Sequence, residues 1–138
     1  MDFFAPTYHW IRDPLFYLLL GLGLIAWFLP APYFTLPLWW LALMALVEEL
    51  IFRGLIQEGL NKLFRHRFWI GPISLANLVT SILFAGAHLF AQPVGWALAT
   101  FFPSLAFGFV WDRHKSIWAC FVLHLSYNLF FFHLGTNV

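Results

Sequence analysis

Charge is scarce in this 138-residue chain, because only 9% of its residues are Asp, Glu, Lys or Arg, against roughly a quarter in ordinary globular domains. The formal net charge is +1 and the basic residues stand singly or in short groups, which excludes the broad basic surface of a nucleic-acid-binding protein. A disordered or acidic tail is excluded as well. Cys120 is the only cysteine, so there is no intrachain disulfide and no multi-cysteine metal site.

Apolar residues are abundant instead. They make up 62% of the chain, with eighteen Phe and eight Trp, and the mean hydropathy is +0.81. A small core cannot hide this much apolar surface, so much of it must face lipid. The length allows only one domain, residues 1–138, and we expect an integral, multipass membrane protein.

Five apolar stretches have the length of candidate membrane spans, for which about twenty residues are needed. They cover approximately residues 15–29, 38–64, 73–90, 94–111 and 116–134. Pro30, Pro32 and Pro37 predict a tight, irregular connection between the first two. The predicted fold class is therefore an all-α bundle of about five transmembrane helices.

The basic residues indicate an orientation for such a bundle. Five crossings bring all but one of them to one side, namely Arg12, Lys62, Arg65, Arg67, Arg113 and Lys115. Lys and Arg near span ends favour the cytoplasm, so we expect a cytoplasmic N-terminus and a C-terminus on the far side. The small size suggests a bacterial inner membrane.

The second span carries charged residues at membrane depth, where they are costly and usually functional. Glu49 and Arg53 are four residues apart, so they share a helix face and can pair. Glu48 has no such local partner and lies near the bilayer middle. A carboxylate in that position is suited to act as a general base.

Polar residues on the later spans also repeat at helical spacing. Asn77, Ser81 and His88 form a polar seam on the third span that should face other helices. On the fifth span, His124 and Asn128 project together from one face, and such a pair can donate to an oxyanion.

The fourth span has a different pattern. Thr100, Ser104 and Gly108 recur every four residues, which is the small-residue spacing that lets membrane helices approach closely. We interpret this stripe as packing.

Taken in order, these residues resemble the three motifs of the CAAX prenyl protease and bacteriocin-processing family, which comprises glutamic-type intramembrane endopeptidases. The motif residues here are Glu48-Glu49-x-x-x-Arg53, Phe84-x-x-x-His88 and His124-x-x-x-Asn128. The resemblance implies that Glu48 and His88 activate a water molecule for attack on a peptide carbonyl. It implies that His124 and Asn128 stabilise the oxyanion. Glu49 and Arg53 would support the site or bind the substrate.

The implied function is hydrolysis of a peptide bond in a membrane-associated protein or peptide, without a cofactor. The better-known eukaryotic-type members are much larger than this chain, so their substrates do not transfer, and nothing here requires a prenylated one. The sequence specifies neither the substrate nor the oligomeric state.

Other interpretations stay open at this point. Glu48, His88 and His124 have the ligand types of a zinc protease with an open coordination position. Cys120 precedes His124 by four residues, so a Cys–His dyad is possible. A non-catalytic immunity or peptide-binding membrane protein, or less readily a transporter, would also use buried polar residues, and Glu49–Arg53 would then be an internal ion pair.

Some ionisable residues are expected to have ordinary roles. Glu58 and Lys62 are predicted to form an i,i+4 pair at the membrane boundary. The remaining histidines are expected to be solvated or interfacial; they are His9, His66, His114 and His133.

Overall fold

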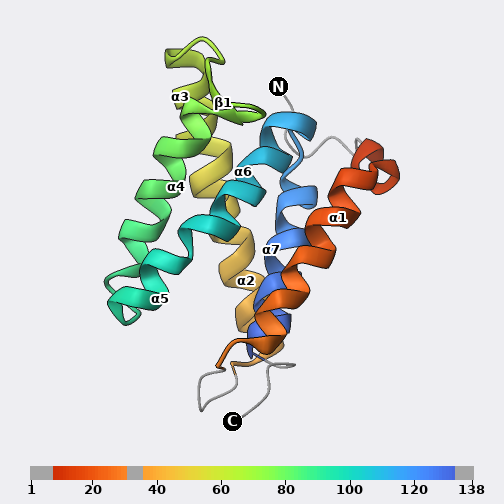
Figure 1. Ribbon diagram of the computed structural model, residues 1–138, viewed down its shortest axis with the longest axis vertical. Coiled ribbons are helices and arrows are strands. Elements are labelled where there is room, and N and C mark those ends of the chain that lie inside the picture. Colours follow the sequence, from red (N-terminus) through yellow and green to blue (C-terminus); the bar gives the residue numbers. More distant parts are fainter. Residues whose placement is uncertain (1–7, 31–35, 133–138) are drawn as a thin grey trace.

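The computed structural model describes residues 8–30 and 36–132, which form a bundle of five helical segments (Figure 1). Three segments are composite. The first joins η1 (Tyr8–Arg12), α1 (Pro14–Leu22) and η2 (Gly23–Phe28); the second joins α2 (Leu38–Glu49), η3 (Leu50–Gln57) and α3 (Glu58–Leu63); the fourth joins α5 (Val94–Ala99) and α6 (Phe101–His114). The third is α4 (Leu75–His88) and the fifth is α7 (Ile117–Phe132). These segments match the five predicted apolar stretches.

Helix length tests the span prediction only in part. Val94–His114 is the one described helix that is long and apolar enough to cross a membrane, and three shorter apolar helices cover Pro14–Phe28, Leu75–His88 and Ile117–Phe132. The second segment carries Glu48, Glu49 and Arg53 and so is not a simple apolar span. The number of crossings and the side of the N-terminus stay predictions. The proline-rich connection and His133 fall largely or wholly outside the described residues.

Side-chain caps explain where several helices begin. The Asp13 carboxylate accepts a hydrogen bond from the Leu15 amide at 3.1 Å, and Pro14 occupies the first helical position, where it needs no donor. The Ser74 hydroxyl accepts from the Asn77 amide at 2.9 Å and starts α4. Lys115 ends α6 in the left-handed region, with φ of 49°.

Two irregularities interrupt the long helices. The turns of Leu50–Gln57 are wound as π-helix, which is rare and occurs frequently at functional sites. Thr100 separates α5 from α6, and Pro103 follows in the first turn of α6, where its missing amide removes a hydrogen bond to the preceding turn. Neither irregularity was predicted from the sequence.

A short β-hairpin corrects the purely helical prediction. Strands β1 (Phe68–Ile70) and β2 (Ile73–Ser74) pair antiparallel, so the third helix begins at Leu75 rather than at 73. Aromatic and β-branched residues favour strands, and Gly71, with φ of +50°, adopts the left-handed conformation that this tight turn requires.

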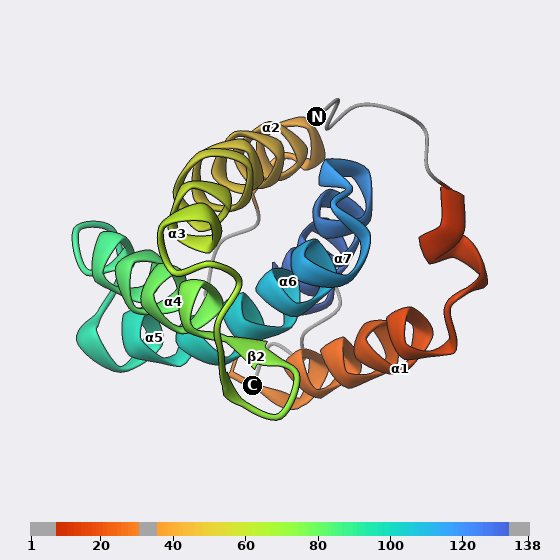
Figure 2. The ribbon, with the colours of Figure 1, turned by 90° about the horizontal axis from the view of Figure 1, so that it is seen from above.

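Helices α6 and α7 lie at the centre of the bundle, with the other segments arranged around them (Figure 2). Their core cluster includes Phe107, Trp111 and Leu123, packed against Phe16 of α1. Outward-facing apolar side chains are numerous, and Phe90 is 95% exposed. An apolar exterior around a packed interior is what a bilayer solvent favours.

Polar contacts that were not predicted from the sequence gather at one end of the bundle. Asp13 binds Arg113, and its carboxylate lies 2.8 Å from Nε2 of His114. The hydrogen bond from Arg113 lowers the pKa of Asp13 to about 2. His114, expected to be solvated or interfacial, is half-buried and contacts Asp13 at this end of the bundle, so it is not simply solvated.

The predicted Glu58–Lys62 pair is replaced by a closer one, and Lys62 interacts with Glu58 only electrostatically over a longer range. The Glu58 carboxylate is buried and accepts from Lys115 Nζ at 2.6 Å and from the Trp111 indole at 3.1 Å, while Lys62 is exposed. Helical spacing allowed Lys62 to pair, but the approach of the α6–α7 junction supplies a closer cation. The contacts of Asp13 and Glu58 place Arg113 and Lys115 at the same end as α3.

Candidate active site

Three candidate residues from three helices converge on one point. Oε2 of Glu48, at the end of α2, lies 3.8 Å from Nε2 of His88 on α4 and 3.9 Å from Nε2 of His124 on α7. This oxygen is buried and has no hydrogen-bond donor among the described residues. The two separations exceed direct hydrogen-bond length and suit contact through one bridging atom. Residues 76 positions apart in the sequence therefore share one centre.

Each histidine is oriented through its other ring nitrogen. Nδ1 of His88 lies 2.8 Å from the carbonyl oxygen of Phe84, one turn earlier on α4. Nδ1 of His124 lies 2.7 Å from Oε1 of Glu49. A carbonyl and a carboxylate accept hydrogen bonds, so the network assigns a proton to both Nδ1 atoms and turns both Nε2 atoms toward Glu48.

Aromatic rings fix the plane of the His124 imidazole. The ring stacks on Phe107 with centroids 4.6 Å apart and an interplanar angle of 18°. Phe84 meets it edge-on at 5.9 Å. Only 6% of the His124 side chain is exposed, so the imidazole is held by packing as well as by Glu49.

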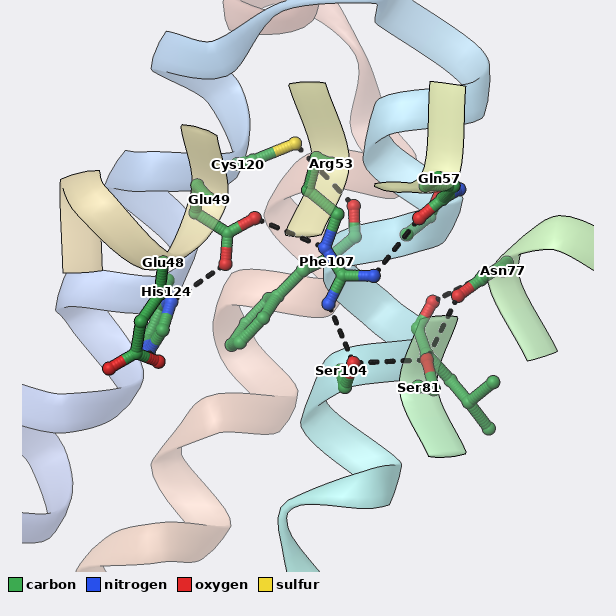
Figure 3. A network of polar contacts seen from close by, with 12 residues as sticks. Glu48, Glu49, Arg53, Gln57, Asn77, Ser81, Ser104, Phe107, Cys120 and His124 are labelled. Atoms are coloured by element: carbon green, nitrogen blue, oxygen red, sulfur yellow. Dashed lines mark hydrogen bonds and ion pairs between the residues drawn. The ribbon is translucent and has the colours of Figure 1, made fainter. Parts of the chain in front are cut away.

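Glu49 and Arg53 form the predicted ion pair, and both side chains are fully buried. Arg53 Nε lies 3.2 Å from Oε2 of Glu49, whose other oxygen accepts from His124 (Figure 3). The pair is therefore the support behind His124. Burial is tolerable because every guanidinium nitrogen has a partner.

Two of these guanidinium partners were not among the predicted site residues. Arg53 donates to Oε1 of Gln57 at 3.0 Å and to the Ser104 hydroxyl at 2.6 Å. Gln57 lies four residues after Arg53, so helical spacing was the available signal. Ser104 belongs to the small-residue stripe, which was interpreted as packing alone.

The network continues into the predicted polar seam of α4. Ser104 donates to Ser81 at 3.0 Å, and Ser81 donates to Oδ1 of Asn77 at 3.1 Å (Figure 3). The seam therefore does face another helix. Gly108 makes this possible, because a Cβ at that position would lie 1.9 Å from Oδ1 of Asn77. The small-residue stripe thus serves both close packing and the polar network.

A cavity of about 520 Å³ adjoins the centre. His88, His124 and Asn128 line it, and most of its other lining residues are aromatic or aliphatic. Asn128 follows His124 by one helical turn and shares this cavity. The arrangement offers these three polar side chains to a mainly apolar chamber, which suits binding of an apolar ligand with one reactive polar group.

The geometry bears on two of the alternative chemistries, the Cys–His dyad and the zinc site. Cys120 is buried, and its thiol donates to the carbonyl of Phe107 at 3.5 Å, so it does not face the cavity. A group of three His, Cys, Asp or Glu side chains arranged to hold a metal ion is not found within residues 8–30 and 36–132.

Comparison with known proteins gives one result. A family model described as type II CAAX prenyl endopeptidase Rce1-like matches residues 30–130. The matched region contains all of the motif residues and starts after the first helical segment. Neither the curated proteins nor the solved structures contain a match.

Proposed function

The chain belongs to the Rce1-like family of type II CAAX prenyl endopeptidases, which are integral membrane proteins, and we propose that it is a glutamic-type endopeptidase that cleaves within the membrane. Its substrate is a membrane-associated protein or peptide. The observation that carries the proposal is the convergence of Oε2 of Glu48 with the Nε2 atoms of His88 and His124.

Glu48 acts as the general base in this proposal. A water molecule held between Glu48 and His88 donates one proton to the carboxylate as its oxygen attacks the peptide carbonyl. The proton then passes from Glu48 to the leaving amine when the carbon–nitrogen bond breaks. The 3.8 Å separation supports this role, because it leaves room for a bridging oxygen.

His124 and Asn128 stabilise the tetrahedral intermediate. Glu49 accepts from Nδ1 of His124 and so orients the ring, which turns Nε2 toward the reaction centre, where an Nε2–H donates to the oxyanion. The Asn128 amide supplies a second donor from the same face of α7. Arg53 is a positioning residue, because it acts through Glu49.

The apolar cavity indicates the kind of substrate. Its walls suit apolar side chains beside the scissile bond or a lipid chain attached to it. We also place the end that carries Arg12, Lys62 and Arg113 in the cytoplasm, following the positive-inside rule.

The direct test compares protein termini in membranes of cells carrying either the native chain or Glu48→Gln, at matched levels. Gln nearly conserves volume and removes the base, so new termini should be confined to the native sample. Ser126→Ala is a matched control, because Ser126 donates only to the Val122 carbonyl of its own helix. Equal termini in the native and Glu48→Gln samples, with the Ser126→Ala sample also unchanged, would argue for the non-catalytic alternative.

The reaction is proposed to need no metal, since Glu48 serves as base and His88 and His124 act directly on the water and the oxyanion. Cleavage by the purified chain should therefore persist in a chelator. Loss of cleavage that zinc restores would favour the zinc alternative with Glu48, His88 and His124 as ligands.

A further inference from the structure

The β1–β2 hairpin presents a surface of apolar residues at one end of the bundle. Phe68, Trp69 and Ile70 are 64%, 55% and 60% exposed. The hairpin lies across the helix ends rather than along them (Figure 1). Exposed aromatic side chains at that level are typical of the boundary between lipid tails and headgroups.

Exposed cations outnumber anions at this end of the bundle. The side chains of Arg12, Lys62, Arg65 and Arg67 are exposed, and none forms an ion pair within the described part of the chain. The nearby carboxylates are already engaged: Asp13 by Arg113 and His114, Glu58 by Lys115, and Asp112 by Ser74, Asn61 and Lys115. This end therefore carries surplus positive charge.

An apolar groove adjoins the hairpin. It has a volume of about 320 Å³, and its walls are Leu15, Leu18 and Leu19 of α1 and Leu105, Ala106 and Phe109 of α6. Pro72 and Ile73, at the hairpin turn, also line it. Every lining residue is apolar, so the groove suits a hydrocarbon chain and offers nothing to a polar ligand.

We propose that this hairpin and groove bind one anionic phospholipid. The headgroup phosphate pairs with Arg65 and Arg67, the ring of Trp69 lies at the level of the glycerol, and an acyl chain fills the groove between α1 and α6. The charge surplus selects an anionic over a zwitterionic lipid. The groove selects a lipid over a soluble phosphate compound, which has no chain to place there. This proposal is independent of catalysis.

The test uses the full chain purified in detergent and titrated with phosphatidylglycerol or phosphatidylcholine of the same acyl chains, with retained lipid counted by native mass spectrometry. Phosphatidylglycerol should be retained in preference. Arg65→Gln with Arg67→Gln should weaken that preference by roughly fivefold for each cation removed. Trp69→Ser should weaken retention of both lipids.

The matched control is Phe90→Ser, which removes a 95% exposed aromatic residue far from the hairpin and should leave retention unchanged. Leu18→Trp, which narrows the groove, should weaken retention without changing the headgroup preference. Inorganic phosphate should not displace the lipid. Equal retention of both lipids by the native chain would overturn the proposal, as would displacement by phosphate, which would indicate a soluble anion site.

Discussion

The Nδ1 atom of His124 lies 2.7 Å from Oε1 of Glu49, and this contact joins the polar network to the proposed catalytic centre. Glu49 accepts from Arg53 through its second oxygen. The two adjacent glutamates, Glu48 and Glu49, therefore differ in their hydrogen bonding and their burial. Glu49 is saturated and fully buried, whereas the side chain of Glu48 is 28% exposed and turns an unpaired oxygen toward both histidines.

This contrast predicts that substitution of Glu49 lowers stability, whereas substitution of Glu48 lowers activity and leaves stability nearly unchanged. Glu49→Gln removes the charge that compensates Arg53, and breaking a buried ion pair costs about 3–5 kcal/mol. Glu48→Gln leaves that pair intact. The thermal unfolding midpoint of the detergent-purified protein should therefore fall strongly in Glu49→Gln and little in Glu48→Gln. Similar losses in the two variants would mean that Glu48 is also structural.

Ser104 should contribute to stability through Arg53. Ser104→Ala removes a hydrogen bond to a buried cation, and such bonds contribute about 1.5–3 kcal/mol. Ser126→Ala is again the control, because it loses a bond within one helix only. The thermal unfolding midpoint of Ser104→Ala should be lower than that of Ser126→Ala. Equal midpoints would show that the Arg53 guanidinium finds another partner.

Helical spacing was enough to predict part of the site. The Glu49–Arg53 pair follows from an i,i+4 interval, and His124 with Asn128 share a cavity wall for the same reason. Gln57 satisfied the same interval relative to Arg53, but this interval was not applied to it in predicting the site.

Long-range contacts were beyond sequence reasoning. Whether His124 binds Glu48 or Glu49 depends on how α7 packs against α2, and His114 meets Asp13 across 101 positions. The hairpin was missed although Phe68, Trp69 and Ile70 favour a strand, because the third span was expected to begin at 73. The π-helical turns of Leu50–Gln57 have no sequence signal that we can identify.

Gly108 should tolerate no side chain. In Gly108→Ala the new Cβ would meet Asn77 Oδ1 and force α4 and α6 apart, with loss of the Gln57 hydrogen bond to the Gly108 carbonyl. Overpacking of this kind costs about 1–3 kcal/mol. The control is Gly21→Ala, because nothing lies within 4 Å of a Cβ at Gly21. The thermal unfolding midpoint should fall for Gly108→Ala and not for Gly21→Ala. Equal midpoints would mean that α4 and α6 can move apart at Gly108 without loss of stability.

The contact of Asp13 with Arg113 should make stability depend on acid. The pKa of Asp13 falls from 3.8 to about 2, chiefly because Arg113 donates a hydrogen bond to the carboxylate. A group with a lowered folded-state pKa stabilises the fold fully above its unfolded pKa and loses that effect as the pH falls through the folded value. The contribution is therefore complete above about pH 4 and is lost toward pH 2.

Asp13→Asn isolates this effect, because Asn also caps a helix but carries no charge. At pH 6 the variant should unfold at a lower temperature than the native chain, and the difference should narrow as the pH falls from about 4 to about 2. Asp112→Asn is the comparison, since Asp112 accepts hydrogen bonds from the neutral Asn61 and Ser74, and the Lys115 ammonium lies 3.8 Å away. The contrary result is that the unfolding temperatures of the native chain and of Asp13→Asn differ by the same amount at every pH. That result would mean that the Asp13–Arg113 ion pair contributes no stability beyond the helix cap.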